Sequence, residues 1–273
     1  MRPVRLGAVS YLNVRPLVFG LDRSPRFTLR YDVPSECARL LQAGDIDLGM
    51  VPSIEYTRGD GYRIVQDLAI VSDGPVASVA LFSTRPMADV RSIAMDASSR
   101  TSVALVRVLC KRVFKIEPSI ETCGPDLPAM LTRADAALII GDNALLQPSI
   151  QHPAPGTQHP VPVEKTDLGQ VWTEWTGLPF VWAVWAGRTN ALGADDVRAL
   201  QRARDAGEIQ PDAIAREFFR DFPQHHALGA EYLRTNLKYH LGDRERAGLE
   251  TFYRYASEIG IAPDPGQLRF FQV

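Results

Sequence analysis

The chain has 273 residues, a hydrophobic content of 45% and a formal net charge of −2. This length fits one large domain or two smaller lobes, and the hydrophobic content is ample for a packed core. The 30 basic and 32 acidic side chains are scattered, with no basic stripe or zinc-finger spacing. These features exclude a typical nucleic-acid-binding protein.

Export and membrane signals are absent from the sequence pattern. The first residues lead directly into the short apolar run Val4–Val9, without the longer apolar stretch and cleavage site of a secretory signal. No run approaches the roughly 18 apolar residues of a membrane span. Cys37, Cys110 and Cys123 are odd in number and widely spaced, which argues against a disulfide framework or a cysteine-rich zinc site. We therefore expect a cytoplasmic protein with no membrane partner.

The first part of the chain alternates between strand and helix signals. Apolar runs bounded by turn residues predict strands at Val4–Val9, Phe27–Val33, Ile46–Val51, Ile64–Val71 and Ser78–Ser83. Pro34 suits the start of a helix that Gly44 can end. Strand–helix–strand order of this kind predicts a parallel sheet with covering helices.

A second α/β segment follows, and then the pattern becomes helical. It contains predicted strands at Ser92–Met95, Ser119–Thr122, Ala136–Ile140 and Pro179–Ala186, with an amphipathic helix over 101–114. Five prolines predict an irregular surface segment over 147–163. After Gly187, helices are expected at 195–207, 211–220, 226–239 and 243–259.

This order predicts a two-lobed α/β protein with a helical C-terminal tail packing on the first lobe. Lobe I comprises residues 1–83 and 184–273, and lobe II comprises 86–180. Strands near 78–83 and 179–185 are expected to cross between them. A ligand cleft is then expected at the strand ends, where open α/β sheets bind ligands.

The turn Asp96–Ser102 is the strongest candidate site. It lies between a predicted strand and helix, and it offers hydroxyls, free backbone N–H groups and the guanidinium of Arg100. Such a helix N-terminus can bind a carboxylate or a phosphate. Serine and threonine also favour this position simply as helix caps, so both interpretations stay open.

Other polar turns also follow predicted strands. They are Ser10–Asn13, Pro52–Tyr56, Asp73–Ser78 and Gly141–Asn143. Each could line the same cleft, but taken alone each is first of all an ordinary turn or cap. No histidine has metal-ligand spacing, and nucleotide or nucleophile-elbow motifs are absent, so we expect neither a metal nor another cofactor.

Several of these segments together resemble a known family. They are Val9–Leu17, Val51–Tyr56, Gly74–Val79, Ser98–Leu105, Asp167–Trp172 and Trp175–Phe180. In this order they resemble the chorismate dehydratases of the futalosine route to menaquinone. The match extends over most of residues 4–187, whereas the helical tail carries no distinctive motif.

The resemblance implies a periplasmic-binding-protein-like fold of type II that acts as an enzyme. The implied reaction removes water from chorismate to give 3-[(1-carboxyvinyl)oxy]benzoate, which makes the protein a carbon–oxygen lyase. Since loss of the C3 proton and the C4 hydroxyl makes the ring aromatic, the site mainly has to orient a dianionic substrate and exclude water.

The resemblance also implies roles for individual residues. Asn13 would orient the departing hydroxyl or the enolpyruvyl carboxylate. Ser78 would hold the substrate or relay a proton at the reacting face. We hypothesise that the substrate's own enolpyruvyl carboxylate accepts the C3 proton. The remaining substrate-binding candidates are Tyr11, Ser53, Ser99, Arg100, Thr101, Ser102 and Asn143.

Three other functions remain open at this point. A non-catalytic solute receptor would have the same fold, because fold does not determine function. The related 1,4-dihydroxy-6-naphthoate synthase would need a distinct base, often histidine, in the cleft. A regulator's effector domain is weaker, since no helix-turn-helix segment precedes the first strand. The oligomeric state is left open.

Overall fold

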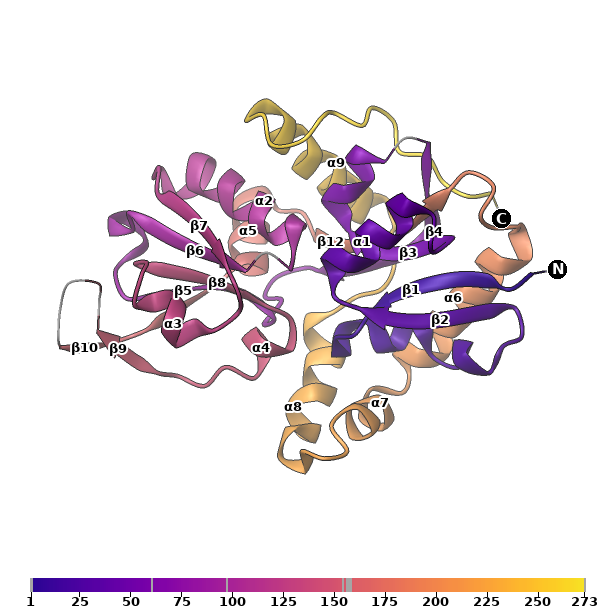
Figure 1. Cartoon of the computed structure of the whole chain (residues 1–273), viewed down its shortest axis with the longest axis horizontal. Helices are drawn as coiled ribbons and strands as arrows, with labels where there is room; N and C mark the ends of the chain where they lie inside the picture. The colour runs from indigo at the N-terminus through magenta and orange to yellow at the C-terminus, as the bar shows by residue number, and fades with distance from the viewer. Residues whose placement is uncertain (1, 60, 97, 154, 156–158, 273) are drawn as a thin grey trace. The chain divides into compact units, whose positions relative to one another are not determined.

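The computed structural model describes residues 2–59, 61–96, 98–153, 155 and 159–272. The chain forms two compact units, one made of Met1–Asp73 with Leu178–Val273 and the other of Gly74–Gly177. We call them unit 1 and unit 2; in Figure 1, unit 1 carries the indigo strands and the orange-to-yellow helices, and unit 2 the magenta elements.

The chain passes between the units at Asp73–Gly74 and at Gly177–Leu178. The sequence predicts strands near 78–83 and 179–185 that cross between the lobes; in the structure each of these strands pairs within the sheet of one unit. Gly74 and Gly177, which lie at the two chain passages, both adopt a positive φ that favours glycine.

Unit 1 is built on a five-stranded sheet of order β2-β1-β3-β12-β4. Its strands are β1 (Val4–Val9), β2 (Phe27–Asp32), β3 (Leu48–Pro52), β4 (Tyr62–Ser72) and β12 (Phe180–Arg188). β1 is parallel to β2 and β3, whereas β12 is antiparallel to β3 and β4. The sheet is therefore mixed rather than fully parallel, because β12 enters from unit 2 at the edge where β3 and β4 end.

The N-terminal helices of unit 1 follow the predicted signals. α1 (Pro34–Ala43) starts with proline in its first turn and ends at Gly44, whose φ of 83° suits a glycine cap. Short 3₁₀ segments occupy η1 (Leu12–Val18), η2 (Leu21–Arg23) and η3 (Ser53–Arg58).

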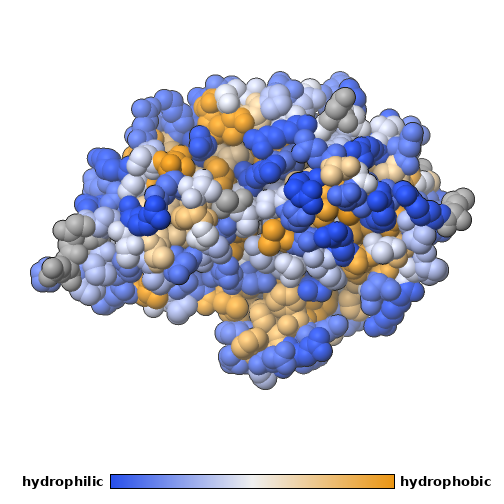
Figure 2. Space-filling model, in the orientation of Figure 1, coloured by the Kyte–Doolittle hydropathy of each residue, from blue (hydrophilic) through white to orange (hydrophobic). Residues whose placement is uncertain are grey.

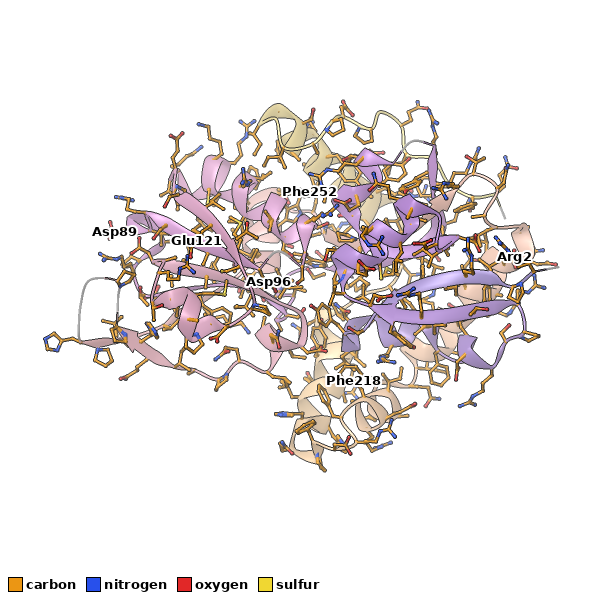
Figure 3. The ribbon with its side chains drawn as sticks, viewed as in Figure 1. Arg2, Asp89, Asp96, Glu121, Phe218 and Phe252 are labelled. Carbon is orange, nitrogen blue, oxygen red and sulfur yellow. The ribbon has the colours of Figure 1, made fainter. Side chains whose placement is uncertain are left out.

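The C-terminal helices belong to unit 1, as predicted. They are α6 (Ala194–Glu208), α7 (Pro211–Phe218), η6 (Pro223–His225), α8 (His226–Glu231), η7 (Tyr232–Asn236) and α9 (Asp243–Glu258). α6 packs on η1 and β4, and α9 packs on β12. Phe252 of α9, labelled in Figure 3, meets the ring of Phe180 edge-on at 4.9 Å between centroids. Apolar colour gathers over α7 and α8 on the face seen in Figure 2, in the region that carries the exposed Phe222 and Leu228.

Unit 2 has its own five-stranded sheet, of order β11-β5-β8-β6-β7. Its strands are β5 (Val79–Ser83), β6 (Ser92–Asp96), β7 (Ser119–Cys123), β8 (Ala136–Ile140) and β11 (Glu164–Asp167). β6 is parallel to β7 and β8, and β5 is antiparallel to β8 and β11.

Helices cover both faces of this second sheet (Figure 1). They are α2 (Arg100–Leu109), extended by the π-helical turn η5 (Cys110–Phe114), α3 (Leu127–Leu131), α4 (Gly141–Leu145) and α5 (Leu168–Thr176), with the short 3₁₀ turn η4 (Met87–Asp89). α3 and α4 cover a buried cluster that includes Phe82, Met130 and Ile139, while α2 and α5 pack against each other. Among the described residues, none of the helices combines the length and apolarity needed to cross a membrane.

The proline-rich segment is partly ordered into a hairpin. β9 (Gln151–Pro153) pairs antiparallel with β10 (Pro160–Pro162), although the sequence predicts only irregular structure here. Residues 154 and 156–158 of this segment lie outside the described residues.

Candidate functional site

The sheet of unit 1 has one edge at which two polar segments follow strands. β1 and β3 are parallel and end there, and β4 ends beside the start of β12, with Ser72 opposite Phe180 and Pro52 opposite Ala183. The turn Ser10–Asn13 and the start of η3 follow directly. We call this the carboxyl edge of unit 1.

Asn13 lies in η1 at this edge. Its buried neighbours Leu12 and Val14 anchor the 3₁₀ turn, while Asn13 itself is half-buried. The side-chain oxygen Oδ1 is buried and has no hydrogen-bond partner among the described residues. Leaving a buried acceptor unpaired costs about 1–3 kcal/mol, so a ligand donor at this oxygen would be favoured.

Tyr11 and Ser53 lie at the same edge in different environments. Tyr11 precedes η1, and its carbonyl accepts the N–H of Val14 at 3.3 Å. Ser53 is fully buried: its hydroxyl donates to the carbonyl of Val181 at 2.8 Å, and its carbonyl accepts the Tyr253 hydroxyl at 2.6 Å. The Ser53 hydroxyl thus ties η3 to β12, which is a structural role.

Unit 2 has an equivalent carboxyl edge. β6 and β7 end at the paired residues Asp96 and Cys123, and β8 ends at Ile140 beside the start of β5 at Val79. β11 ends at Asp167, opposite Ala80. This register brings Ser78, the N-termini of α2 and α4, and Asp167 to the same edge.

Ser78 follows a tightly bonded loop. Ser78 is 1% exposed, and its N–H donates to the carbonyl of Val76 at 2.7 Å. Ala77 has a φ of 61°, in the left-handed region that a residue with a Cβ avoids at a cost of about 1–2 kcal/mol. The carboxylate of Asp167 compensates, since it accepts the N–H of Val76 at 3.0 Å and of Ala77 at 2.6 Å.

Lys165 stabilises the same loop through the carbonyl of Ala77. Its Nζ donates to the carbonyl of Ala77 at 2.9 Å and to that of Ala144, in α4, at 3.0 Å. Burial lowers the pKa of the Lys165 ammonium, since a charged group loses solvation there.

The predicted anion site at α2 is first of all a helix cap. Ser99 is the N-cap: its Oγ accepts the N–H of Ser102 at 3.4 Å and shares a hydrogen bond with the Ser102 hydroxyl at 2.9 Å. Thr101 is buried and Arg100 half-buried in the first turn. The capping interpretation is confirmed, and it does not exclude an anion, because the first N–H groups of a helix lack partners within the helix itself.

Asp96 is the first residue of the turn that the sequence predicts as a candidate site, although the sequence gives its carboxylate no role of its own. Asp96 ends β6 (Figure 3) and is 2% exposed. Its Oδ1 accepts the N–H of Ser98 at 2.9 Å, but Oδ2 and the Ser98 Oγ are buried and have no partner among the described residues. Ala97 lies outside the described residues.

Asn143 is the remaining candidate from the sequence. Asn143 is exposed in α4, after Gly141, which has a φ of 64°. Lys165 fastens this helix to the Ala77 loop. Within the part of the chain that the structure describes, no group of three or more His, Cys, Asp or Glu side chains is arranged to hold a metal ion.

Comparison with known proteins identifies the family. Residues 4–258 match the model of a family described as menaquinone biosynthesis. The chain belongs to this family. It is 35% identical over 269 residues to the chorismate dehydratase of Thermus thermophilus, an alignment that covers 96% of this chain and 97% of the relative.

Solved structures agree on the fold of this family member. An Archaeoglobus fulgidus protein aligns with a TM-score of 0.70 and 16% identity, covering 95% of this chain and 98% of that one. The periplasmic aliphatic sulphonate-binding protein of Escherichia coli aligns with a TM-score of 0.63 and 16% identity, covering 99% and 98%. The predicted periplasmic-binding-protein-like fold is confirmed.

Proposed function

We propose that this chain is a chorismate dehydratase, converting chorismate into 3-[(1-carboxyvinyl)oxy]benzoate and water in the futalosine route to menaquinone. The observation that carries the proposal is the 35% identity to the Thermus chorismate dehydratase over 96% of the chain. The family match over residues 4–258 supports the same pathway.

The reaction needs little acid or base strength from the protein. The C3–H bond breaks and its electron pair forms a ring double bond, while the C4–O bond breaks and the hydroxyl leaves with a proton as water. No oxidant or reductant is required, because the ring becomes aromatic by elimination alone. Holding the substrate in the reactive orientation is then the main task, and such positioning can supply several kcal/mol.

Asn13 and Ser78 are the proposed catalytic residues. The unpaired Oδ1 of Asn13 supports this role, since an amide acceptor can take a hydrogen bond from the substrate hydroxyl. Ser78 is supported by its place on a tightly bonded loop at the carboxyl edge of unit 2. The enolpyruvyl carboxylate of the substrate is the proposed acceptor of the C3 proton, an intramolecular transfer that orientation favours.

The first turn of α2 is proposed to bind a substrate carboxylate through Ser99, Arg100, Thr101 and Ser102. Backbone N–H groups, the helix dipole and a guanidinium all favour an anion there. Tyr11 and Asn143 are secondary contacts, and Ser53 is left out because its hydroxyl is bonded to Val181.

The decisive experiment incubates the purified chain with chorismate and follows the product, one water lighter, by mass spectrometry and aromatic absorbance. Turnover is expected. Retention of chorismate without conversion would favour a solute receptor instead. In a parallel incubation with the cyclic precursor of 1,4-dihydroxy-6-naphthoate, conversion of that compound alone would favour the related synthase.

Variants at the catalytic residues sharpen the test. Asn13→Ala and Ser78→Ala should each lower kcat by about 10²–10³-fold, the range for losing one aligned polar group in an active site. Asn190→Ala and Ser83→Ala are matched controls. Asn190 follows β12 at the opposite edge, and Ser83 is a buried serine at the far end of β5 whose hydroxyl has no partner among the described residues. A control that loses as much activity as its partner variant would contradict the assignment.

A further inference from the structure

We propose that Asp167 is a positioning residue that holds Ser78 in its reactive place, an inference that rests on the proposed function. Asp167 begins one of the segments that carry the family resemblance, but the sequence assigns it no role, and its local signal is that of an ordinary helix cap. Its carboxylate also contacts the loop before Ser78, which lies about 90 residues earlier in the sequence.

The carboxylate of Asp167 accepts three backbone N–H groups. Oδ1 accepts the N–H of Gln170 at 3.0 Å, which caps α5, and the N–H of Val76 at 3.0 Å. Oδ2 accepts the N–H of Ala77 at 2.6 Å. Both oxygens are therefore committed, and two of the three donors belong to the loop that precedes Ser78.

A simple cap needs only one of these contacts. Asp126 provides the comparison within the same unit, since it caps α3 by accepting the N–H of Ala129 on Oδ1 at 3.1 Å. Asp167 makes the same capping bond and adds the two loop bonds, which span 91 and 90 residues of sequence. The additional bonds define its special role.

The loop leaves Ser78 little freedom. Asp167 holds the N–H of Ala77, Lys165 holds its carbonyl at 2.9 Å, and the Ala77 φ of 61° needs such support to persist. The Gly74 N–H is fixed on the Thr173 hydroxyl of α5 at 3.0 Å. Ala77, the residue before Ser78, is thus held at both its N–H and its carbonyl by side chains of β11.

The test is a double-mutant cycle between Asp167→Asn and Ser78→Ala. An asparagine keeps one acceptor oxygen for the cap but turns an NH₂ donor toward the loop amides. Asp167→Asn should lower kcat by about 10–100-fold with a smaller change in KM, since a small misplacement of a reacting group has that effect. In the Ser78→Ala background it should lower kcat by less than about 3-fold, because the two changes act through one group.

Three outcomes separate the possibilities. Equal kcat losses from Asp167→Asn in both backgrounds would indicate a merely structural residue and overturn this inference while leaving the dehydratase proposal intact. An unchanged kcat for Ser78→Ala would overturn it as well. No turnover by the unsubstituted chain would overturn the proposed function, and the inference with it.

Asp126→Asn is the matched control, and amide hydrogen exchange is the independent readout. Asp126→Asn should keep the cap of α3, because the amide oxygen can still accept the N–H of Ala129, and it should leave kcat unchanged. Asp167→Asn should accelerate exchange at Val76 and Ala77 by at least about 10-fold relative to the Asp126 variant, a local opening that does not depend on catalysis. Unchanged exchange at both amides would overturn the proposed hold on the loop.

Discussion

At the scale of single residues, some polar side chains at the two carboxyl edges have hydrogen-bond partners within the chain, and others have none among the described residues. The Ser53 hydroxyl is bonded to Val181, and Ser99 is bonded to Ser102. In contrast, Oδ1 of Asn13 and Oδ2 of Asp96 have no partner among the described residues. Since buried polar atoms are almost always paired in folded proteins, these oxygens are the places where a ligand donor would stabilise most.

Sequence reasoning finds some of these residues and cannot find others. Asn13 and Ser78 come from the family resemblance, and Ser99 from the capping pattern that follows a strand. The bonding of Ser53 could not be predicted, because its partner Val181 lies 128 residues away. The role of Asp167 depends in the same way on the register between β11 and β5, which no local pattern encodes.

The buried thiol of Cys37 predicts a pH effect on stability. Burial raises its pKa to about 12, whereas the unfolded chain ionises near the ordinary value of 9.0. Above that value the unfolded state binds fewer protons, so this residue's contribution to stability is present below pH 9 and is lost as pH rises toward 12. Between pH 9 and 10.5 the loss is at most about 2 kcal/mol, from 1.4 kcal/mol per pH unit.

Thermal unfolding of Cys37→Ala measures this effect. The decrease in Tm between pH 8 and pH 10.5 should be smaller in Cys37→Ala than in the unsubstituted chain, even if the variant has the lower Tm at pH 8. Parallel decreases in the two proteins would show that the thiol titrates no differently in the folded state.

At the scale of elements, most predicted strands are confirmed because apolar runs between turn residues are local signals. β1, β6 and β8 match within a residue. The helix predicted over 226–239 is wrong at its end: it passes into η7 and stops at Asn236, because Lys238 forms a bridge with Val71 of β4. Backbone bonds of 2.9 Å in both directions between these residues replace the helical ones.

Because α6 packs closely on η1, we expect a glycine-to-alanine substitution in α6, which normally stabilises a helix, to destabilise this chain. Alanine is usually better than glycine within a helix. A Cβ on Gly207, however, would lie 2.2 Å from the carbonyl oxygen of Pro16, which is backbone and cannot turn aside. Gly207→Ala should therefore destabilise the chain by about 1–3 kcal/mol, as overpacking does.

Denaturant unfolding of Gly207→Ala tests the packing, with Gly124→Ala as the control. A Cβ on Gly124 would meet no heavy atom within 4 Å, and this residue needs no positive φ, so its substitution should be neutral or slightly stabilising. A Gly207→Ala chain as stable as the unsubstituted one would mean that α6 does not lie against η1 in solution.

At the scale of the whole molecule, the α/β class and the helical tail could be predicted, whereas the place of β12 could not. The run Phe180–Arg188 reads as a strand, but its insertion between β3 and β4 depends on long-range pairing. Local hydrophobicity does not choose a neighbour, and the same run could equally pair at a sheet edge.

The division of the chain predicts that unit 2 folds alone. Gly74–Gly177 is a single continuous segment with its own sheet and a buried cluster under α3 and α4. Domains with these properties usually fold independently. The isolated segment should unfold cooperatively in urea and keep a near-ultraviolet circular dichroism signal from Trp172 and Trp175, whose rings pack edge-on at 5.8 Å. Gradual unfolding without that signal would contradict this prediction.

The position of β12 also has a consequence for synthesis. Unit 1 begins the chain, yet the strand that joins β3 to β4 is translated only after all of unit 2. At roughly 5–20 residues per second, the ribosome leaves β3 and β4 without their shared neighbour for several seconds. Unit 2 can then fold before unit 1 is complete. Until β12 emerges, the unpaired edges of β3 and β4 are where a chaperone would be needed.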